Sequence, residues 1–443
     1  MRIIRKIYCR AFQTVFRAAL PFLPYRNPKI IPTVAGIADV CRKKGIRSVM
    51  IVTDGGIRAL GLTEFLEKTL TEAEISYCIY DRTVANPTIQ NVEEARALYL
   101  EQKAEALIAF GGGSSMDCAK AAGARIAKPR QSIRQMKGLL KVHKRLPLLI
   151  AVPTTAGTGS ETTLAAVITD SEKHHKYPIN DFCLIPHYAV LDYHETMGLP
   201  RSITATTGMD ALTHAVEAYI GCSTTRETRM MAEEAVHLIY QHLKAAYDDG
   251  QDKEARSAML RAAYCAGVAF TKSYVGYIHA VAHSLGGQYG TPHGLANAVI
   301  LPIVLRMYGP ACEKKLARLA RKAGVVDKAM KDQEAAESFI GWIQDMNDAM
   351  EIPRHFPEIQ MEDIPVMAGH ADREGNPLYP VPVLMDQKQL ERIYYEVKGR
   401  APFKPGPRTD VKRGNAGGSR GLFRRSFKPG LAADQKRNHN RGR

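Results

Sequence analysis

The chain has 443 residues and a mass of 48.9 kDa, which is enough for two or three domains. Hydrophobic residues make up 45% of it and charged residues 24%, which excludes a collagen-like or wholly disordered protein. No run of about 20 apolar residues occurs, so the sequence predicts no helix that spans a membrane.

The formal charge of +16 is carried by the two ends of the chain. Residues 1–26 contain six basic and no acidic residues, and residues 404–443 contain twelve basic and two acidic ones, so residues 27–403 are formally neutral. A neutral body does not suit a phosphate backbone, and we expect no specific nucleic-acid binding. The basic ends can still attract anionic surfaces weakly.

Residues 1–26 form a segment of their own, in which basic residues alternate with large apolar ones ahead of Pro21 and Pro24. This pattern predicts a basic amphipathic helix. We favour a helix that packs on the protein or on a second subunit, and the alternative is a helix on a membrane surface. The segment lacks a clear cleavage site, and the eight cysteines form no CxxC pair. Both features indicate a cytoplasmic protein.

The next part of the chain alternates short apolar runs with segments of helical period. Apolar runs at 48–54, 77–81, 106–110 and 148–152 predict buried strands, and the period of residues 92–102 predicts a helix between two of them. Such alternation is typical of a mainly parallel sheet with helices on both faces. We therefore predict an α/β dinucleotide-binding domain over residues 27–195.

After about residue 200 the pattern becomes helical. The segments 226–247, 254–271 and 313–323 are rich in Ala, Leu, Met and charged residues, and strand-like runs are rare. An all-α domain over residues 196–403 is predicted. Residues 404–443 contain few large apolar groups and much Gly, Arg, Lys and Asn, which predicts a disordered basic tail.

Two polar loops follow predicted strands in the first domain. Gly111, Gly112 and Gly113 lead into Ser114, where a helix is expected to begin, and such a turn suits a pyrophosphate. The other loop begins at Thr154. Ligands of open α/β sheets lie beyond the carboxyl ends of strands, so both loops point to one crevice. A tight turn and a loop of capping threonines remain the alternatives.

Asp54 follows a third strand. An acid there can accept hydrogen bonds from an adenosine ribose and repel a 2′-phosphate. An exposed turn aspartate is the alternative.

Four histidines and one aspartate carry the strongest signal in the second domain. Asp210 and His214 are four residues apart, as are His279 and His283, so each pair shares one helix face. His293 follows ten residues later. Imidazole and carboxylate ligands without thiolate suit Fe²⁺ or Zn²⁺. A single histidine of this kind is more often a satisfied core residue, but the two paired spacings favour a metal site.

These segments resemble the iron-containing (group III) alcohol dehydrogenases over about residues 27–401. The resemblance rests on the segments Gly111–Ser114, Pro153–Glu161, Gly208–His214 and the run from His279 to Asn297. Neither charged end belongs to the common pattern. The resemblance implies a dinucleotide-binding domain followed by a helical metal-binding domain, as the residues themselves indicate.

The resemblance also implies roles for individual residues. Asp210, His214, His279 and His293 match the metal ligands, with Fe²⁺ expected and Zn²⁺ as an alternative, and His283 matches a nearby histidine that relays a proton. The cofactor contacts that it implies are Asp54, Asn86, Gly112, Gly113, Ser114, Asp117, Thr154, Thr155, Thr163 and Lys176. Asp54 favours NAD over NADP, because family members that prefer NADP often have a small residue there.

The implied reaction moves a hydride between NAD and a small alcohol, aldehyde or ketone, with the metal polarising the substrate oxygen. A homo-oligomer is expected. The enzymatic alternatives are a polyol (glycerol-like) dehydrogenase and an enzyme like dehydroquinate synthase. The apolar residues Val275, Ile278 and Val281 around His279 favour a small substrate over a sugar phosphate. The non-enzymatic alternative, anionic-surface or nucleic-acid binding through the ends, does not explain the metal set.

Overall fold

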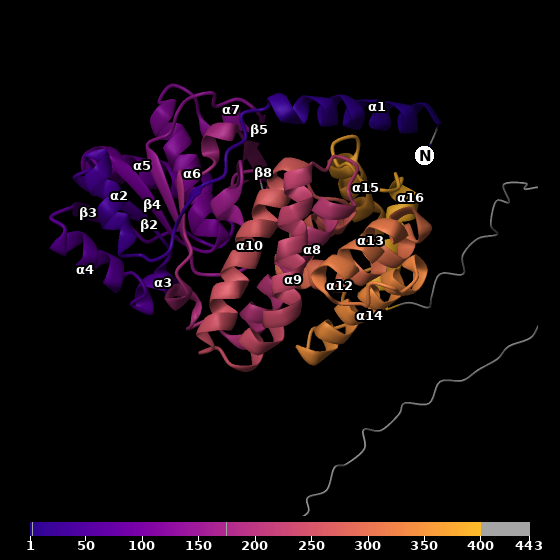
Figure 1. Ribbon diagram of the computed structural model, residues 1–443. Helices are drawn as coiled ribbons and strands as arrows, with labels where there is room; N and C mark the ends of the chain where they lie inside the picture. Colours follow the sequence, from indigo (N-terminus) through magenta and orange to yellow (C-terminus); the bar gives the residue numbers. More distant parts are fainter. Residues whose placement is uncertain (2, 174, 400–443) are drawn as a thin grey trace, which may run out of the picture. The chain divides into compact units, whose positions relative to one another are not determined.

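A six-stranded parallel sheet organises the first half of the chain (Figure 1). The computed structural model describes Met1, residues 3–173 and residues 175–399. The strands, in their order across the sheet, are β1 (Lys29–Ile31), β9 (Tyr188–Val190), β6 (Leu148–Pro153), β4 (Ala106–Gly111), β2 (Ser48–Val52) and β3 (Ser76–Tyr80). Every pairing between them is parallel. The four strands predicted from apolar runs are all present, with ends shifted by one or two residues.

Helices cover both faces of this sheet, because successive residues of a strand point to opposite sides. On one side Met50 and Val52 pack with helices α5 (Ile89–Glu101) and α6 (Gly113–Ala127). On the other side Val49 and Ile51 pack with α2 (Gly36–Lys44) and α4 (Glu64–Glu72). The short helices α3 (Gly55–Ala59) and α7 (Ile133–Met136) complete this half. The predicted α/β architecture is confirmed.

A second, smaller sheet was not expected from the sequence. It contains β5 (Gly138–Leu139), β8 (His175–Asn180) and β7 (Ala165–Asp170), and β7 and β8 pair antiparallel. In β7 every second residue is buried, and the buried residues are Ala166, Ile168 and Asp170. Strand β8 has no continuous apolar run of the kind by which the other strands were recognised, whereas β7 contains a short one at residues 165–168 that the sequence analysis did not use.

The remainder of the described chain is helical, as predicted. Its helices are α8 (Arg201–Ile220), α9 (Arg226–Asp248), α10 (Lys253–Ser273), α11 (Tyr277–Tyr289), α12 (His293–Tyr308), α13 (Pro310–Ala323), α14 (Asp332–Ala349), α15 (Ile364–Gly375) and α16 (Gln387–Val397). Helix α8 is buried from Gly208 to Ile220, where it packs against α9, α10 and α12. The predicted tail at 404–443 lies outside the described residues.

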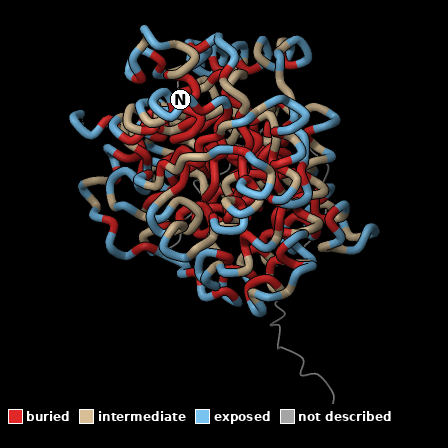
Figure 2. Tube along the Cα trace, turned by 90° about the vertical axis from the view of Figure 1, so that its left-hand side faces the viewer, coloured by how far each residue is buried: buried red, intermediate tan, exposed pale blue. Residues whose placement is uncertain are grey.

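Buried segments run through the interior, between exposed turns (Figure 2). Among the described helices, none is both long and apolar enough to cross a membrane. The predicted N-terminal helix is α1 (Ile3–Ala19), followed by a 3₁₀ turn at Leu20–Phe22. It packs on the protein through Cys9 and Gln13, in agreement with the favoured interpretation.

Candidate metal centre and cofactor loops

Three helices bring the four predicted metal ligands together. Asp210 and His214 lie one turn apart on α8, His279 lies on α11, and His293 is the first residue of α12. One ligand atom from each residue lies within 4.8 Å of the corresponding atoms of the other three. The close approach of α12 to α8 requires Gly294, since a Cβ there would lie 2.5 Å from the carbonyl oxygen of Thr206.

Burial keeps the imidazoles of this cluster neutral. It lowers the pKa of His279 well below its ordinary value, lowers that of His293 to about 4, and lowers that of His214. A neutral imidazole offers a lone pair, which is the form that binds a cation. Three neutral imidazoles and the Asp210 carboxylate form a donor set that fits Fe²⁺ or Zn²⁺.

The amide nitrogen of Asn297 lies close to the ligand atoms of Asp210, His279 and His293. This atom, Nδ2, lies 2.7 Å from Asp210 Oδ1, 3.2 Å from His279 Nε2 and 3.1 Å from His293 Nε2. An amide nitrogen carries two hydrogens, so it cannot give each of these three acceptors a hydrogen bond of its own. A cation beside the three atoms would satisfy lone pairs that the protein leaves without a full partner.

Glu217, which the sequence analysis missed, orients the imidazole of His279. Its buried carboxylate lies 2.6 Å from His279 Nδ1 and accepts hydrogen bonds from the backbone N–H groups of Gly276 and Ile278 at the start of α11. Burial raises the pKa of Glu217 to about 7, and the backbone donors oppose this. A carboxylate on Nδ1 leaves Nε2 directed at the metal position, as in many carboxylate–histidine–metal arrangements.

His283 lies beside this cluster without belonging to it. Its ring stacks on that of His293 at a centroid distance of 5.0 Å, and its Nδ1 lies 2.6 Å from Glu374 Oε1. The same Glu374 oxygen accepts a hydrogen bond of 2.7 Å from the Tyr379 hydroxyl. The His283 side chain is 43% exposed. Glu374 and Tyr379 were also missed in the sequence.

The two predicted cofactor loops lie next to each other because β4 and β6 are neighbours in the sheet. The Thr154 N–H donates to the Gly111 carbonyl at 3.1 Å, and a Cβ on Gly112 would lie 3.8 Å from Thr155. Helix α6 begins at Gly113, one residue before the expected start. Its free N-terminal N–H groups therefore open onto the edge where both loops meet.

Three more of the predicted contacts form one cluster at this edge. The Asn86 N–H donates to Ser114 Oγ at 3.3 Å, and Lys176 Nζ donates to Asn86 Oδ1 at 2.6 Å. Asn86 has a left-handed backbone with φ of 58°, a conformation that asparagine adopts more readily than most residues. The cluster places a cationic side chain beside the start of α6, where a phosphate would be attracted.

Asp117 and Thr163 are held mainly by the protein itself. The Asp117 carboxylate accepts hydrogen bonds from Ser160 Oγ and the Val167 N–H, both at 3.0 Å. Thr163 Oγ1 accepts one of 2.8 Å from Lys120, a fully buried lysine that the sequence analysis missed. Burial lowers the pKa of Lys120 to about 8. These residues fix the shape of the loop.

Asp54 is half-buried and caps helix α3, so it is not the exposed turn aspartate of the alternative interpretation. Its Oδ1 accepts from the N–H groups of Gly56 and Ile57 at 3.0 Å, and its Oδ2 lies 3.3 Å from Ser115 Oγ. Capping engages one oxygen and leaves the second at the sheet edge, beside the glycine loop. The cap is therefore compatible with a ribose contact.

The cofactor loops adjoin the metal cluster. A Cβ on Gly157, in the loop after β6, would lie 2.5 Å from Cβ of Thr207 on α8, three residues before Asp210. A nucleotide bound along the sheet edge would thus extend towards the four metal ligands.

Two family models match this chain. The model for iron-containing alcohol dehydrogenase covers residues 32–193, and that for the Fe-containing alcohol dehydrogenase family, C-terminal, covers residues 204–397. Alcohol dehydrogenase 4 of Saccharomyces cerevisiae is 40% identical over 338 residues, which cover 75% of this chain and 87% of the relative. The NAD-dependent methanol dehydrogenase of Bacillus methanolicus is 36% identical over 329 residues, covering 74% and 86%.

A solved structure shares the fold. A crystal structure of 1,3-propanediol oxidoreductase aligns with a TM-score of 0.81 at 34% identity, covering 84% of this chain and 99% of that one. Together the two models match most of the chain, and the relatives exceed 30% identity over most of their own length. The chain therefore belongs to the iron-containing alcohol dehydrogenase family and is an oxidoreductase.

Proposed function

We propose that the chain transfers a hydride between NAD and a small alcohol, aldehyde or ketone at a ferrous ion held by Asp210, His214, His279 and His293. The observation that carries this proposal is the convergence of four ligand atoms within 4.8 Å of one another, beside the loops at the sheet edge. Fe²⁺ is preferred over Zn²⁺ because of the family to which the chain belongs.

The chemistry divides between the bound groups and the chain. A bound ferrous ion would supply a Lewis acid for the substrate oxygen, and NAD would accept or return the hydride. Glu217 holds the His279 ring in the orientation that a ligand needs. His283, oriented by Glu374, passes a proton between the substrate side and solvent.

The cofactor assignment combines the loops with the name of one relative. The Bacillus methanolicus enzyme is named for its dependence on NAD. Asp54 and the glycine loop would hold the adenosine ribose and the pyrophosphate, with Asn86, Ser114, Thr154, Thr155 and Lys176 along the same edge. Asp117 and Thr163 hold the loop after β6 in place through their bonds to Ser160 and Lys120.

We expect replacement of Asp54 by Gly to move cofactor preference towards NADP. The substitution removes an anionic group from the place proposed for the 2′-phosphate, and kcat/KM for NADP relative to NAD should rise about tenfold or more. Because the cap of α3 is lost as well, Asp54→Asn serves as the control, since an asparagine keeps the cap without the charge. An unchanged ratio in both variants would show that Asp54 does not face the ribose.

The size of the substrate rests on the relatives rather than on the apolar residues around His279. Ile278 and Val281 are fully buried and do not line an open site, whereas Val275 is half-buried, so these residues carry little weight for substrate size. The relatives described above are named for alcohols and a diol. A sugar phosphate is accordingly not proposed.

A direct assay tests the proposed function. The metal-free protein is reconstituted with Fe²⁺ or with Zn²⁺, and reduction of NAD is followed with simple alcohols and diols. We expect turnover that requires the metal and is lost on chelation. A protein fully loaded with either metal that reduces no nicotinamide with any of these substrates would contradict the proposal.

The Glu217→Gln variant should weaken metal binding. Glutamine keeps the side-chain volume but removes the negative charge of the carboxylate beside His279 Nδ1. Changes of this kind typically cost about 10–100-fold in metal affinity or activity. A competitive chelator titration measures the affinity. Glu233→Gln is the matched control, because Glu233 also accepts a hydrogen bond, from Tyr219, away from the metal cluster. Equal affinity in both variants would exclude the proposed role of Glu217.

Two further proposals concern the cellular location and the oligomeric state of the protein. We propose a cytoplasmic location, which the absence of disulfides among the described residues supports, because every described cysteine is a free thiol. Assembly into a homo-oligomer is proposed from the family alone, and the mass measured by light scattering tests it.

A further inference from the structure

Helix α1 lies on the protein through one of its faces. Arg10 donates to the Val381 and Pro382 carbonyls at 2.8 Å, and Gln13 donates to the Tyr379 carbonyl at 2.7 Å. Cys9 is buried on the same face. These contacts fix the helix and determine which of its faces points outward.

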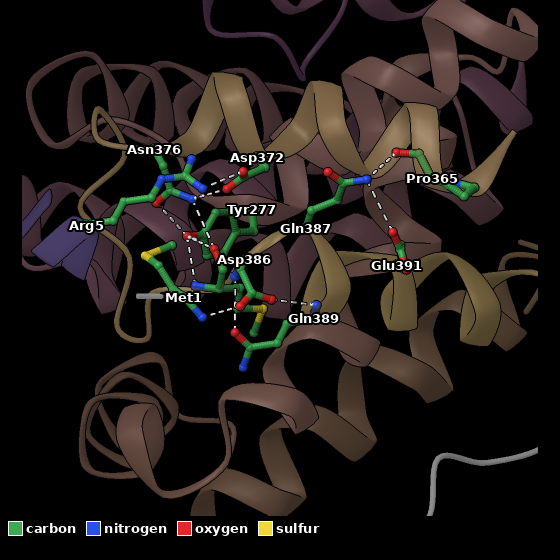
Figure 3. A network of polar contacts seen from close by, with 11 residues as sticks. Met1, Arg5, Tyr277, Pro365, Asp372, Asn376, Asp386, Gln387, Gln389 and Glu391 are labelled. Carbon is green, nitrogen blue, oxygen red and sulfur yellow. Dashed lines mark hydrogen bonds and ion pairs between the residues drawn. The ribbon is translucent and has the colours of Figure 1, made fainter. Parts of the chain in front are cut away.

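Polar contacts also anchor the start of the helix (Figure 3). The N-terminal ammonium of Met1 pairs with Asp386, and Arg5 pairs with Asp372 at 2.8 Å. At the other end the Phe16 ring packs edge-on against Tyr274 at a centroid distance of 5.1 Å. The helix is therefore attached along its length, and its outward face is a fixed feature of the surface.

The outward face of α1 is apolar, although it meets solvent. Seven of the eighteen large apolar side chains that are exposed among the described residues lie between Ile3 and Phe22. Ile4 is 82% exposed, Val15 71% and Phe22 87%. On the helix itself these side chains are Ile3, Ile4, Ile7, Tyr8, Phe12 and Val15. Their spacing gives a continuous apolar stripe on the face opposite the docked one. Contiguous exposed apolar side chains of this kind usually mark an interaction site.

Basic side chains border this apolar stripe. Lys6 and Arg17 are exposed and form no ion pair with any of the described residues. No acidic residue occurs in residues 1–26. An apolar helix face bordered by unpaired cations is complementary to an anionic lipid bilayer. The acyl chains of the bilayer would contact the apolar side chains, and its anionic headgroups would attract the cations.

The region matched by the family models does not include this segment. The family models begin at residue 32, after α1 and the 3₁₀ turn. The basic tail at residues 404–443 likewise follows the end of the matched region at residue 397. Both additions carry net positive charge, so both favour the same kind of anionic partner.

We propose that α1 is a docking surface for anionic membranes, on which it lies flat with its apolar stripe in the headgroup region. Its 17 residues include four basic ones, which is typical of helices that lie in the plane of the interface. Lys6 and Arg17 pair with lipid phosphates at the rim. The reaction proposed above is not needed for this binding, so each can fail without the other.

Cosedimentation with vesicles tests the proposal on the full chain. The probes are vesicles of phosphatidylcholine alone and of phosphatidylcholine mixed with phosphatidylglycerol. The wild type should bind the mixed vesicles in preference. The triple variant Ile4→Ser, Ile7→Ser, Val15→Ser should bind them about tenfold more weakly or worse, because each serine removes apolar area from the contact. The double variant Lys6→Gln, Arg17→Gln should lose the preference for the anionic lipid in part.

A second triple variant, Phe65→Ser, Leu100→Ser, Met230→Ser, is the matched control, since it removes three exposed apolar side chains from other elements. It should bind like the wild type. Melting temperature and dehydrogenase turnover should be unchanged in all variants, which excludes misfolding. If the α1 triple variant binds as tightly as the wild type, the charged ends alone explain the attraction and the proposal is overturned. The proposal is also overturned if the wild type does not bind vesicles. If the α1 triple variant then also has a smaller mass than the wild type by light scattering, α1 is an interface with a second copy of the chain.

Discussion

The His279→Ala variant should lose most of its bound metal and reduce kcat/KM by about 10³-fold or more, because Lewis-acid stabilisation by a bound metal is worth several kcal/mol. His279 is the ligand whose orientation the protein fixes most firmly, through the Glu217 contact at its Nδ1. Metal content by elemental analysis and steady-state kinetics measure the two effects.

The fold should survive this substitution, although it leaves the buried Glu217 without one of its three donors. A melting curve beside the metal analysis separates loss of the ligand from unfolding. His237→Ala is the matched control, because His237 bonds the Ala323 carbonyl on α13, apart from the metal cluster, and should keep its metal. Full metal occupancy in His279→Ala would remove His279 from the ligand set.

The metal ligands could be predicted because the helix period places them. Asp210 and His214 are one turn apart in a segment whose helical character is evident, and the same holds for His279 and His283. Glu217 follows His214 by three residues, so the same period could have identified it as a further acid on that face. It was missed because a lone glutamate in a helix is usually a solvated residue.

Other contacts of the site could not be predicted from the spacing of nearby residues. Glu374 is 91 residues from His283 in sequence, and only the packing of α15 against α11 brings them together. Lys120 lies in a helix with ordinary spacing, and nothing local distinguishes it from an exposed lysine. The parallel sheet, in contrast, was predictable because strands buried on both faces are continuous apolar runs. Strand β8 has no such run, and the run in β7 is limited to residues 165–168.

His283 is expected to contribute through proton transfer, and the strongest test separates this role from a structural one. Replacing it by Ala should lower kcat/KM by about 10²-fold, the usual scale for a positioned acid or base, while the metal stays bound. Added imidazole should restore part of the loss, since a small base can enter the space left beside His293. A merely structural role would not respond to imidazole, and metal loss in this variant would mean that His283 is a ligand.

Glu374 supplies a second and independent check of the same role. Burial lowers the pKa of His283, but the charge of Glu374 and its hydrogen bond outweigh this and raise it. Glu374→Gln keeps an acceptor for Nδ1 and removes the charge, so the His283 pKa should fall in the variant. In alcohol oxidation deprotonated His283 accepts the proton, so the ascending limb of the pH–rate profile that reports His283 should move to lower pH. A profile identical to that of the wild type would show that His283 does not carry the proton, whatever the loss in its own alanine variant.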